Sequence, residues 1–106
     1  MIRGRYRTDG ARHYLELTGH AEYANNGNDI VCAGASSLVY ALLGWMENNE
    51  EDLEWADCDE KSGKVVIHCE GGERTAVVFE MVVIGLEQMA ESYPDHVSIE
   101  ITGIAG

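Results

Sequence analysis

The hydrophobic pattern changes period along the chain, and this change restricts the possible folds more than any other feature. Apolar and polar residues alternate in the first seventeen positions, whereas from residue 30 the apolar residues recur every three to four positions, and both patterns return later. Period two is typical of a strand and period 3.6 of a helix. A chain of 106 residues has room for one hydrophobic core. We therefore predict a single α+β domain over residues 1–106, with helices on at least one face of a sheet.

The first seventeen residues predict a β-hairpin. Residues 1–7 and 13–17 each alternate apolar and polar side chains, and the turn signal Asp9-Gly10 lies between them. Arginines occupy the polar positions of the first strand, a pattern typical of an edge strand. The positions expected to face the core are Ile2, Gly4, Tyr6, Leu15 and Leu17.

Two longer segments predict helices. Residues 30 to about 48 have apolar side chains at helical spacing, and Asp29 is a good N-cap for them. Residues 75–92 contain many valines, which locally favour a strand. The length of this segment favours a helix. Eighteen residues without a turn signal, followed by Pro94, are longer than the usual strand.

Three further strands complete the predicted order of elements. Residues 53–58 and 65–69 form a hairpin through a turn at 61–63, and residues 97–102 alternate as a last strand. The order is therefore ββαββαβ, with a mixed or antiparallel sheet packed against two helices. The order of the strands within the sheet does not follow from these patterns.

The chain is strongly acidic, and its charge restricts the class of partner. Nineteen acidic residues against seven basic ones give a net charge of −12. This balance argues against direct binding of nucleic acid, since phosphate recognition depends on Lys and Arg. A negative field instead raises the encounter rate with a basic protein, although solubility alone explains the same charge. Residues 47–60 hold eight acids and no base, so they form either a solvated rim or a docking surface for a basic chain.

The cellular location follows from what the N-terminal region lacks. No apolar run reaches the ~18 residues of a membrane span. The first residues also contain no signal-peptide core. We expect a cytoplasmic protein with no membrane partner. Three cysteines, an odd number, then indicate reduced thiols rather than disulfides.

A metal site has little support in the sequence. The nearest candidate ligands are Cys58, His68 and Cys69, but adjacent residues of a strand point to opposite faces. No Cys-x-x-Cys pair is present, and no glycine-rich phosphate loop occurs. We expect no metal and no cofactor, and we interpret Cys58 and Cys69 as core thiols.

Cys32 is the strongest candidate for a reactive group. It lies three residues after the expected N-cap, where unpaired backbone N–H groups and the helix dipole favour a thiolate. His20 ends the second predicted strand, and residues 21–29 return the chain to the helix start. The two side chains can therefore approach each other as a nucleophile and its base. The alternatives are a cysteine that only packs and a structural histidine.

Two further side chains and two backbone groups belong to the same hypothesis. Asp29 either orients the His20 ring or only caps the helix through the N–H of Val31 or Cys32, and the cap is favoured. Ser36 lies one helical turn beyond Cys32 and can donate a hydrogen bond into the site. The backbone N–H groups of Cys32 and Ala33 are the candidate oxyanion hole.

Two short segments together resemble the signature of the ribosomal-processing cysteine proteases, the Prp family. One is GHA at 19–21 and the other is DIVCAGAS at 29–36, joined by a short loop containing Gly27. The resemblance extends over nearly the whole chain, including its length, element order and acidic character. The residues AGA at 33–35 replace the more usual Ala-Ala-Val, and smaller side chains there would loosen the first helical turn or enlarge the pocket.

This resemblance implies an α+β homodimer that removes an N-terminal extension from a basic large-subunit ribosomal protein, L-twenty-seven. It implies that Cys32 is the nucleophile and His20 the general base, with Asp29 and Ser36 as supporting residues. The loop 21–29 would order around the substrate. The gating positions of this segment are Gly19, Ala21, Tyr23 and Gly27.

A second hypothesis is a non-catalytic module that binds a basic ribosomal protein through its acidic surface. Such a module would keep its partner intact and would not need Cys32 or His20. A redox enzyme is the least favoured class, because no resolving cysteine lies near Cys32 in the sequence.

Overall fold

The computed structural model of the chain describes residues 1–22, 24 and 29–104. The predicted order ββαββαβ is confirmed, with one short 3-10 turn added between the first helix and the third strand. The elements are β1 (Ile2–Asp9), β2 (Arg12–Thr18), α1 (Ile30–Asn48), η1 (Glu50–Asp52), β3 (Leu53–Lys61), β4 (Lys64–Gly71), α2 (Glu73–Ser92) and β5 (Val97–Ile104).

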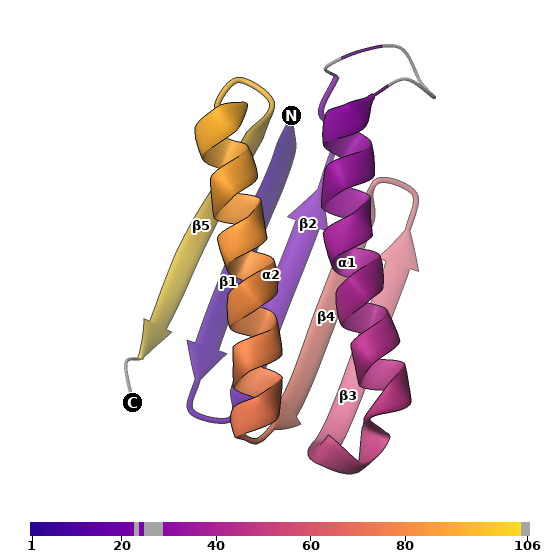
Figure 1. Cartoon of the computed structure of the whole chain (residues 1–106), viewed down its shortest axis with the longest axis vertical. Coiled ribbons are helices and arrows are strands. Elements are labelled where there is room, and N and C mark those ends of the chain that lie inside the picture. The colour runs from indigo at the N-terminus through magenta and orange to yellow at the C-terminus, as the bar shows by residue number, and fades with distance from the viewer. Residues whose placement is uncertain (23, 25–28, 105–106) are drawn as a thin grey trace.

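The five strands form one mixed sheet with the order β3-β4-β2-β1-β5. β5 runs parallel to β1, and the other neighbouring pairs are antiparallel. Both helices cover the same face of this sheet (Figure 1). The domain therefore has two layers, and the second face of the sheet has no helix over it.

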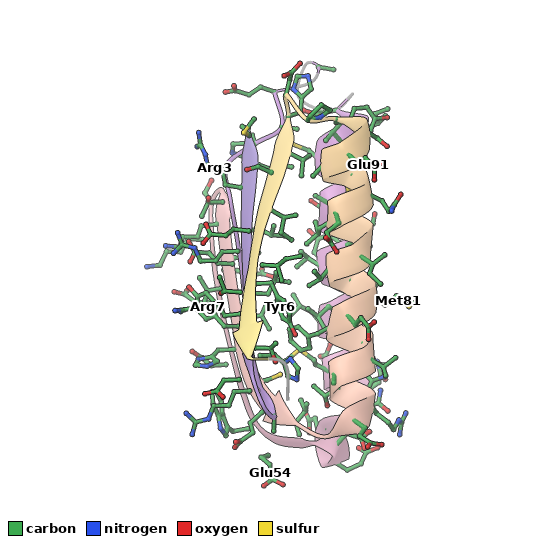
Figure 2. The ribbon with its side chains drawn as sticks, turned by 90° about the vertical axis from the view of Figure 1, so that its left-hand side faces the viewer. Arg3, Tyr6, Arg7, Glu54, Met81 and Glu91 are labelled. Atoms are coloured by element: carbon green, nitrogen blue, oxygen red, sulfur yellow. The ribbon has the colours of Figure 1, made fainter. Side chains whose placement is uncertain are left out.

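The interpretation of residues 1–7 as an edge strand is wrong. β1 lies between β2 and β5 and pairs with both. Its arginines are exposed because they project from the face without helices, where Figure 2 shows Arg3 and Arg7 pointing away from the helices and Tyr6 toward them. The alternating arginines thus indicate that one face of the strand is exposed to solvent. A central strand of a two-layer domain also has such a face, so the pattern does not identify an edge strand.

The hydrophobic core lies between the sheet and the two helices. The predicted inward positions of the first hairpin are all buried. Both the sheet and the helices contribute side chains that are completely inaccessible to solvent. The burial of each such side chain stabilises the fold by roughly 1.5–3 kcal/mol. The most deeply buried apolar residues are Leu15, Leu42, Ile67, Phe79 and Leu86.

The valine-rich segment is a helix, as its length predicted. α2 buries one face of its surface, with the buried residues Thr75, Phe79, Val82, Val83 and Leu86. Gly85 lies where α2 meets α1, because a Cβ atom there would come within 2.8 Å of Leu38 Cδ2. The small residue allows close approach of the two helices, and helical spacing of buried positions prevails over the local preference of valine for strands.

α1 is long and apolar enough, by length and composition alone, to cross a membrane, with a mean hydropathy of 1.4 over 18 residues. Core helices of globular domains meet the same criterion. One side of α1 belongs to the hydrophobic core described above. Its buried residues are Val31, Ala35, Val39, Leu42 and Met46.

His13 is a buried histidine in the core, at the opposite end of β2 from His20. It is 2% exposed, its Nδ1 lies 2.8 Å from the Tyr6 hydroxyl, and its ring stacks on Phe79 with centroids 4.7 Å apart. Its Nε2 has no hydrogen-bond partner among the residues that the structure describes. Burial lowers the pKa of His13, because the charged imidazolium is poorly solvated there.

This burial predicts an acid-sensitive stability. The unfolded chain binds a proton at His13 near pH 6.5, whereas the folded chain does so only at lower pH. Stability should therefore be complete above pH 6.5 and fall as pH drops toward the folded pKa, by at most ~1.4 kcal/mol per pH unit. Urea unfolding of the wild type and of His13→Gln between pH 8 and 5 measures this. The difference between the two stabilities should shrink on acidification, and parallel curves would contradict the prediction.

Candidate active site

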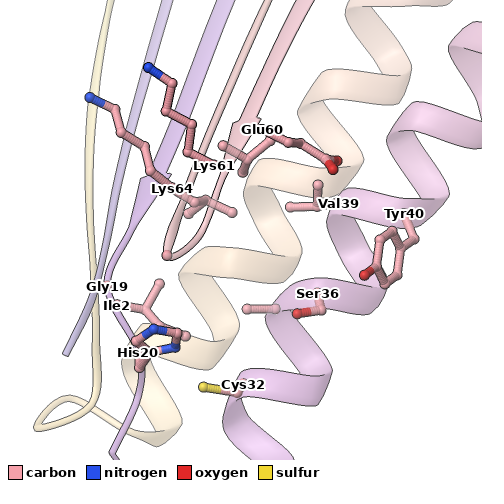
Figure 3. A pocket seen from close by; sticks show the side chains of 14 residues that line it. Ile2, Gly19, His20, Cys32, Ser36, Val39, Tyr40, Glu60, Lys61 and Lys64 are labelled. Atoms are coloured by element: carbon pink, nitrogen blue, oxygen red, sulfur yellow. The ribbon is translucent and has the colours of Figure 1, made fainter.

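Several of the predicted site residues line one open pocket of about 290 Å³, where β2 ends and α1 begins (Figure 3). His20, Cys32 and Ser36 all contribute to its wall. The turn between β3 and β4 closes the other side with Lys61, Gly63 and Lys64. Residues far apart in the sequence therefore meet here.

Cys32 lies in the first turn of α1, half-buried, and the cap of this helix is Asp29. One oxygen of the Asp29 carboxylate accepts hydrogen bonds from the backbone N–H groups of Val31 and Cys32, both at 3.0 Å. The capping role favoured by the sequence is thus present. An additional role of Asp29 in orienting His20 stays a prediction.

The sulfur of Cys32 has a hydrogen-bond donor that the sequence did not indicate. The backbone N–H of Ala21 donates to Cys32 Sγ at 3.2 Å. A hydrogen bond of this kind is stronger when the acceptor is charged, so it favours the thiolate over the thiol. The helix dipole acts in the same direction, since its positive end lies at the first turn.

His20 is placed by two glycines at tight backbone contacts. Gly19 has φ +89°, and a Cβ atom there would lie 2.3 Å from the Met1 carbonyl oxygen. Its N–H donates to the Gly63 carbonyl at 2.8 Å. A Cβ on Gly63, itself at φ +75°, would come within 3.3 Å of His20 Nε2. Both positions therefore require glycine, and Gly63 makes room for the imidazole ring.

The structure brings His20 and Cys32 to the same pocket without joining them. Figure 3 shows the sulfur of Cys32 pointing from α1 toward the end of β2, where His20 lies. Within the described part of the chain, the imidazole makes no hydrogen bond with the sulfur. Contacts between catalytic groups are often loose without substrate and tighten in the complex. The ring of His20 is exposed and lies beside Gly63.

The two predicted oxyanion donors are engaged in the helix cap. Cys32 N–H donates to the Asp29 carboxylate, and Ala33 N–H donates to the Asp29 carbonyl, each at 3.0 Å. An oxyanion would have to compete with Asp29 for them. The assignment of these groups to an oxyanion hole stays a prediction.

The remaining predicted residues occupy different positions. Ser36 is exposed on the pocket wall one turn after Cys32, whereas the Ser37 hydroxyl donates to the Ala33 carbonyl. Ala21 is 1% exposed and belongs to the packed part of the site. Of the other gating positions, Gly19 lines the pocket. Tyr23 and Gly27 lie outside the described residues.

The other two cysteines are poor nucleophiles for different reasons. Cys69 is buried as predicted, and burial raises its pKa to about 11. Cys58 is exposed, so its interpretation as a core thiol is wrong: it lies on edge strand β3, whose residues after Leu53 are all exposed. Partial desolvation, and after it the carboxylates of Glu60, Asp57 and Asp59, raise the pKa of Cys58. Cys58 pairs with Ile67 across the β3–β4 hairpin.

The described residues of the pocket supply a thiol and an imidazole. Among residues 1–22, 24 and 29–104, no group of three His, Cys, Asp or Glu side chains could hold a metal ion. His68 lies on the sheet face without helices, against Trp55 and Tyr14, while its neighbour Cys69 is in the core. A cysteine at a helix start beside a histidine suits nucleophilic attack on a carbonyl.

Comparison with known proteins decides the family. The model of the family described as cysteine protease Prp matches residues 1–98. The chain belongs to the Prp family of cysteine proteases. The ribosomal processing cysteine protease Prp of Mycoplasma pneumoniae is 31% identical over 93 residues, covering 85% of this chain and 88% of the relative. The Prp of Mycoplasma genitalium is 28% identical, covering 84% and 88%.

Solved structures agree with this assignment at the level of the fold. A Prp from Staphylococcus aureus, crystallised with a covalently linked product peptide, superimposes with a TM-score of 0.82 at 19% identity, over 98% of this chain and all of that one. A Streptococcus mutans protein gives a TM-score of 0.74 at 27% identity, over 98% and 96%. The chain is thus a Prp-family cysteine protease, and the non-catalytic module is not favoured.

Proposed function

We propose that this Prp-family protease removes an N-terminal extension from the precursor of a basic large-subunit ribosomal protein, L-twenty-seven. Cys32 acts as nucleophile and His20 as general base. The observation that carries the proposal is the placement of Cys32 Sγ, at a helix start and under the Ala21 N–H, in the pocket that His20 also lines. The similar proteins named ribosomal processing proteases support the class of substrate.

The proposed reaction has two stages. The Cys32 thiolate attacks the scissile carbonyl, and His20 gives a proton to the leaving amine, which leaves an acyl-enzyme. His20 then takes a proton from water as the water attacks the thioester, and the thiolate is released. This order of steps requires His20 to be protonated at the start of the first stage and neutral at the start of the second.

The surroundings of the pocket suit a peptide that places an uncharged side chain in the pocket and has basic residues further along its chain. The floor is apolar, with Ile2, Leu17, Val39 and Val65, so it can take an uncharged side chain. Edge strand β3 runs away from the pocket with exposed acidic side chains. The net charge of −12 would raise the encounter rate with a basic protein. The role of segment 47–60 as a docking surface stays a prediction.

The test is incubation of the enzyme with the precursor from the same organism, followed by mass measurement. We expect a single cut that releases the N-terminal extension and leaves the mature protein intact. A precursor made without the extension is the control and should keep its mass. A precursor that binds but keeps its full mass would contradict the proposal and favour the non-catalytic module.

We also propose that the enzyme is a cytoplasmic homodimer. The outer surface of α2 carries exposed apolar residues at helical spacing, namely Val77, Met81 and Ile84. Figure 2 shows Met81 pointing away from the sheet. Burial of such a stripe against a second copy would remove apolar surface from water, which supports the dimer.

A further inference from the structure

Ala21 is held from both sides by hydrogen bonds of its backbone. Its N–H donates to Cys32 Sγ at 3.2 Å, and its carbonyl lies 2.8 Å from Nδ1 of His96. A carbonyl can only accept, so Nδ1 of His96 carries the proton and donates it. The Ala21 side chain is buried, with 1% exposed. Ala21 thus connects the sulfur of Cys32 to a histidine that lies 75 positions after Ala21 in the sequence.

His96 is itself fixed by the turn between α2 and β5. Its backbone N–H donates to the Tyr93 carbonyl, and its own carbonyl accepts from the N–H of Ile2, both at 2.9 Å. These bonds connect the end of α2 to the start of β1. The imidazole therefore reaches Ala21 from a part of the fold with little freedom to move.

We propose that His96 is a positioning residue of the protease site, which holds Ala21 so that its N–H stays directed at the sulfur of Cys32. The two bonded groups of Ala21 lie on successive peptide planes joined at its Cα atom. With the carbonyl held by His96 and the methyl group buried, rotation that would turn the N–H away from the sulfur is opposed. The proposal rests on the assignment of Cys32 as the nucleophile.

The consequence concerns the thiolate and the base together. Loss of the His96 bond frees the Ala21 backbone, so the Sγ atom loses a donor that favours its charged form. Ala21 directly follows His20, so the same freedom would reach the imidazole. A merely structural role for His96 would change stability and leave the reactivity of folded Cys32 as it was.

The test compares two substitutions of similar shape. His96→Asn keeps an N–H donor close to the position of Nδ1, whereas His96→Leu has none. Both are made with Cys58→Ser, so that Cys32 is the accessible thiol. The alkylation rate of Cys32 by iodoacetamide is followed from pH 5 to 9, and mass spectrometry identifies the modified residue. His68→Leu, on the other side of the sheet, is the matched control.

We expect His96→Leu to slow alkylation at pH 7 about tenfold and to move its pH profile upward, since hydrogen bonds to charged groups are the strong ones. His96→Asn should stay within about twofold of the parent, as should His68→Leu. Circular dichroism shows which variants are folded, and only folded variants are compared. Equal rates for His96→Leu and His96→Asn overturn the proposal. If His96→Leu does not fold, His96→Ala takes its place: an upward shift in His96→Ala but not in His96→Asn supports the proposal, and an unshifted His96→Ala overturns it.

Failure of this inference is distinguishable from failure of the proposed function. Alkylation reports the thiolate of Cys32 without any substrate. A response of alkylation to His96, together with cleavage by a Cys32→Ala variant, would retain the positioning role and reject the nucleophile. No response of alkylation, together with an inactive Cys32→Ala variant, would do the opposite.

Discussion

Replacement of Cys32 by alanine is expected to abolish peptide cleavage, with a loss of about 10³-fold or more in kcat. The variant lacks the sulfur that attacks the carbonyl, and among the described pocket residues the hydroxyl of Ser36 lies one helical turn away from that position. The fold should persist, because alanine suits a helix and the Asp29 cap uses backbone N–H groups only. Cleavage is measured by mass, and folding by circular dichroism.

The matched control uses Cys58, the exposed cysteine. Cys58 lies on β3, and partial desolvation together with the neighbouring carboxylates raises the pKa of its thiol, so Cys58→Ala should cleave at the parent rate. Comparable cleavage by Cys32→Ala and the parent would reject Cys32 as the nucleophile. A loss in Cys58→Ala equal to that in Cys32→Ala would show that thiol removal acts through the fold.

Local patterns were enough for the elements but not for their arrangement. Both helices and all five strands have signals within their own segments, such as the Asp29 cap and the alternation of Leu15 and Leu17. The order of the strands depends on two crossover connections, one through each helix. No local pattern in the sequence predicts where such a connection returns to the sheet. For the same reason the arginines of β1 indicated an edge strand, although β5, from the other end of the chain, pairs with β1 on that side.

The site divides in the same way. Cys32 and His20 were predicted because a helix start and a strand end are recognisable in sequence. Gly63 and His96 were missed because each reaches the site from another part of the chain, through the β3–β4 turn and the turn before β5. Ala21 was predicted only as a gating position, and its short apolar side chain gave no sign that its backbone contacts the sulfur.

Replacement of His20 by alanine is expected to lower kcat/KM for peptide cleavage by about 10²- to 10⁴-fold. The residue gives a proton to the leaving amine, and an amine expelled without a proton is a very poor leaving group. The effect should therefore depend on the leaving group. An ester of the same peptide with nitrophenol needs no proton to leave, so its acylation should lose less than peptide cleavage does.

The comparison of the two substrates separates catalysis from binding. Acylation by the ester is followed as the initial burst of nitrophenolate, because the slow hydrolysis of the acyl-enzyme also uses His20. His68→Ala, a histidine on the sheet face without helices, is the control and should leave both reactions unchanged. A smaller loss for the ester burst than for the peptide is the signature of a proton donor. Equal losses would mean that His20 acts before the leaving group departs, by ionising Cys32 or by holding the substrate, and proton donation to the amine would then fall to another group.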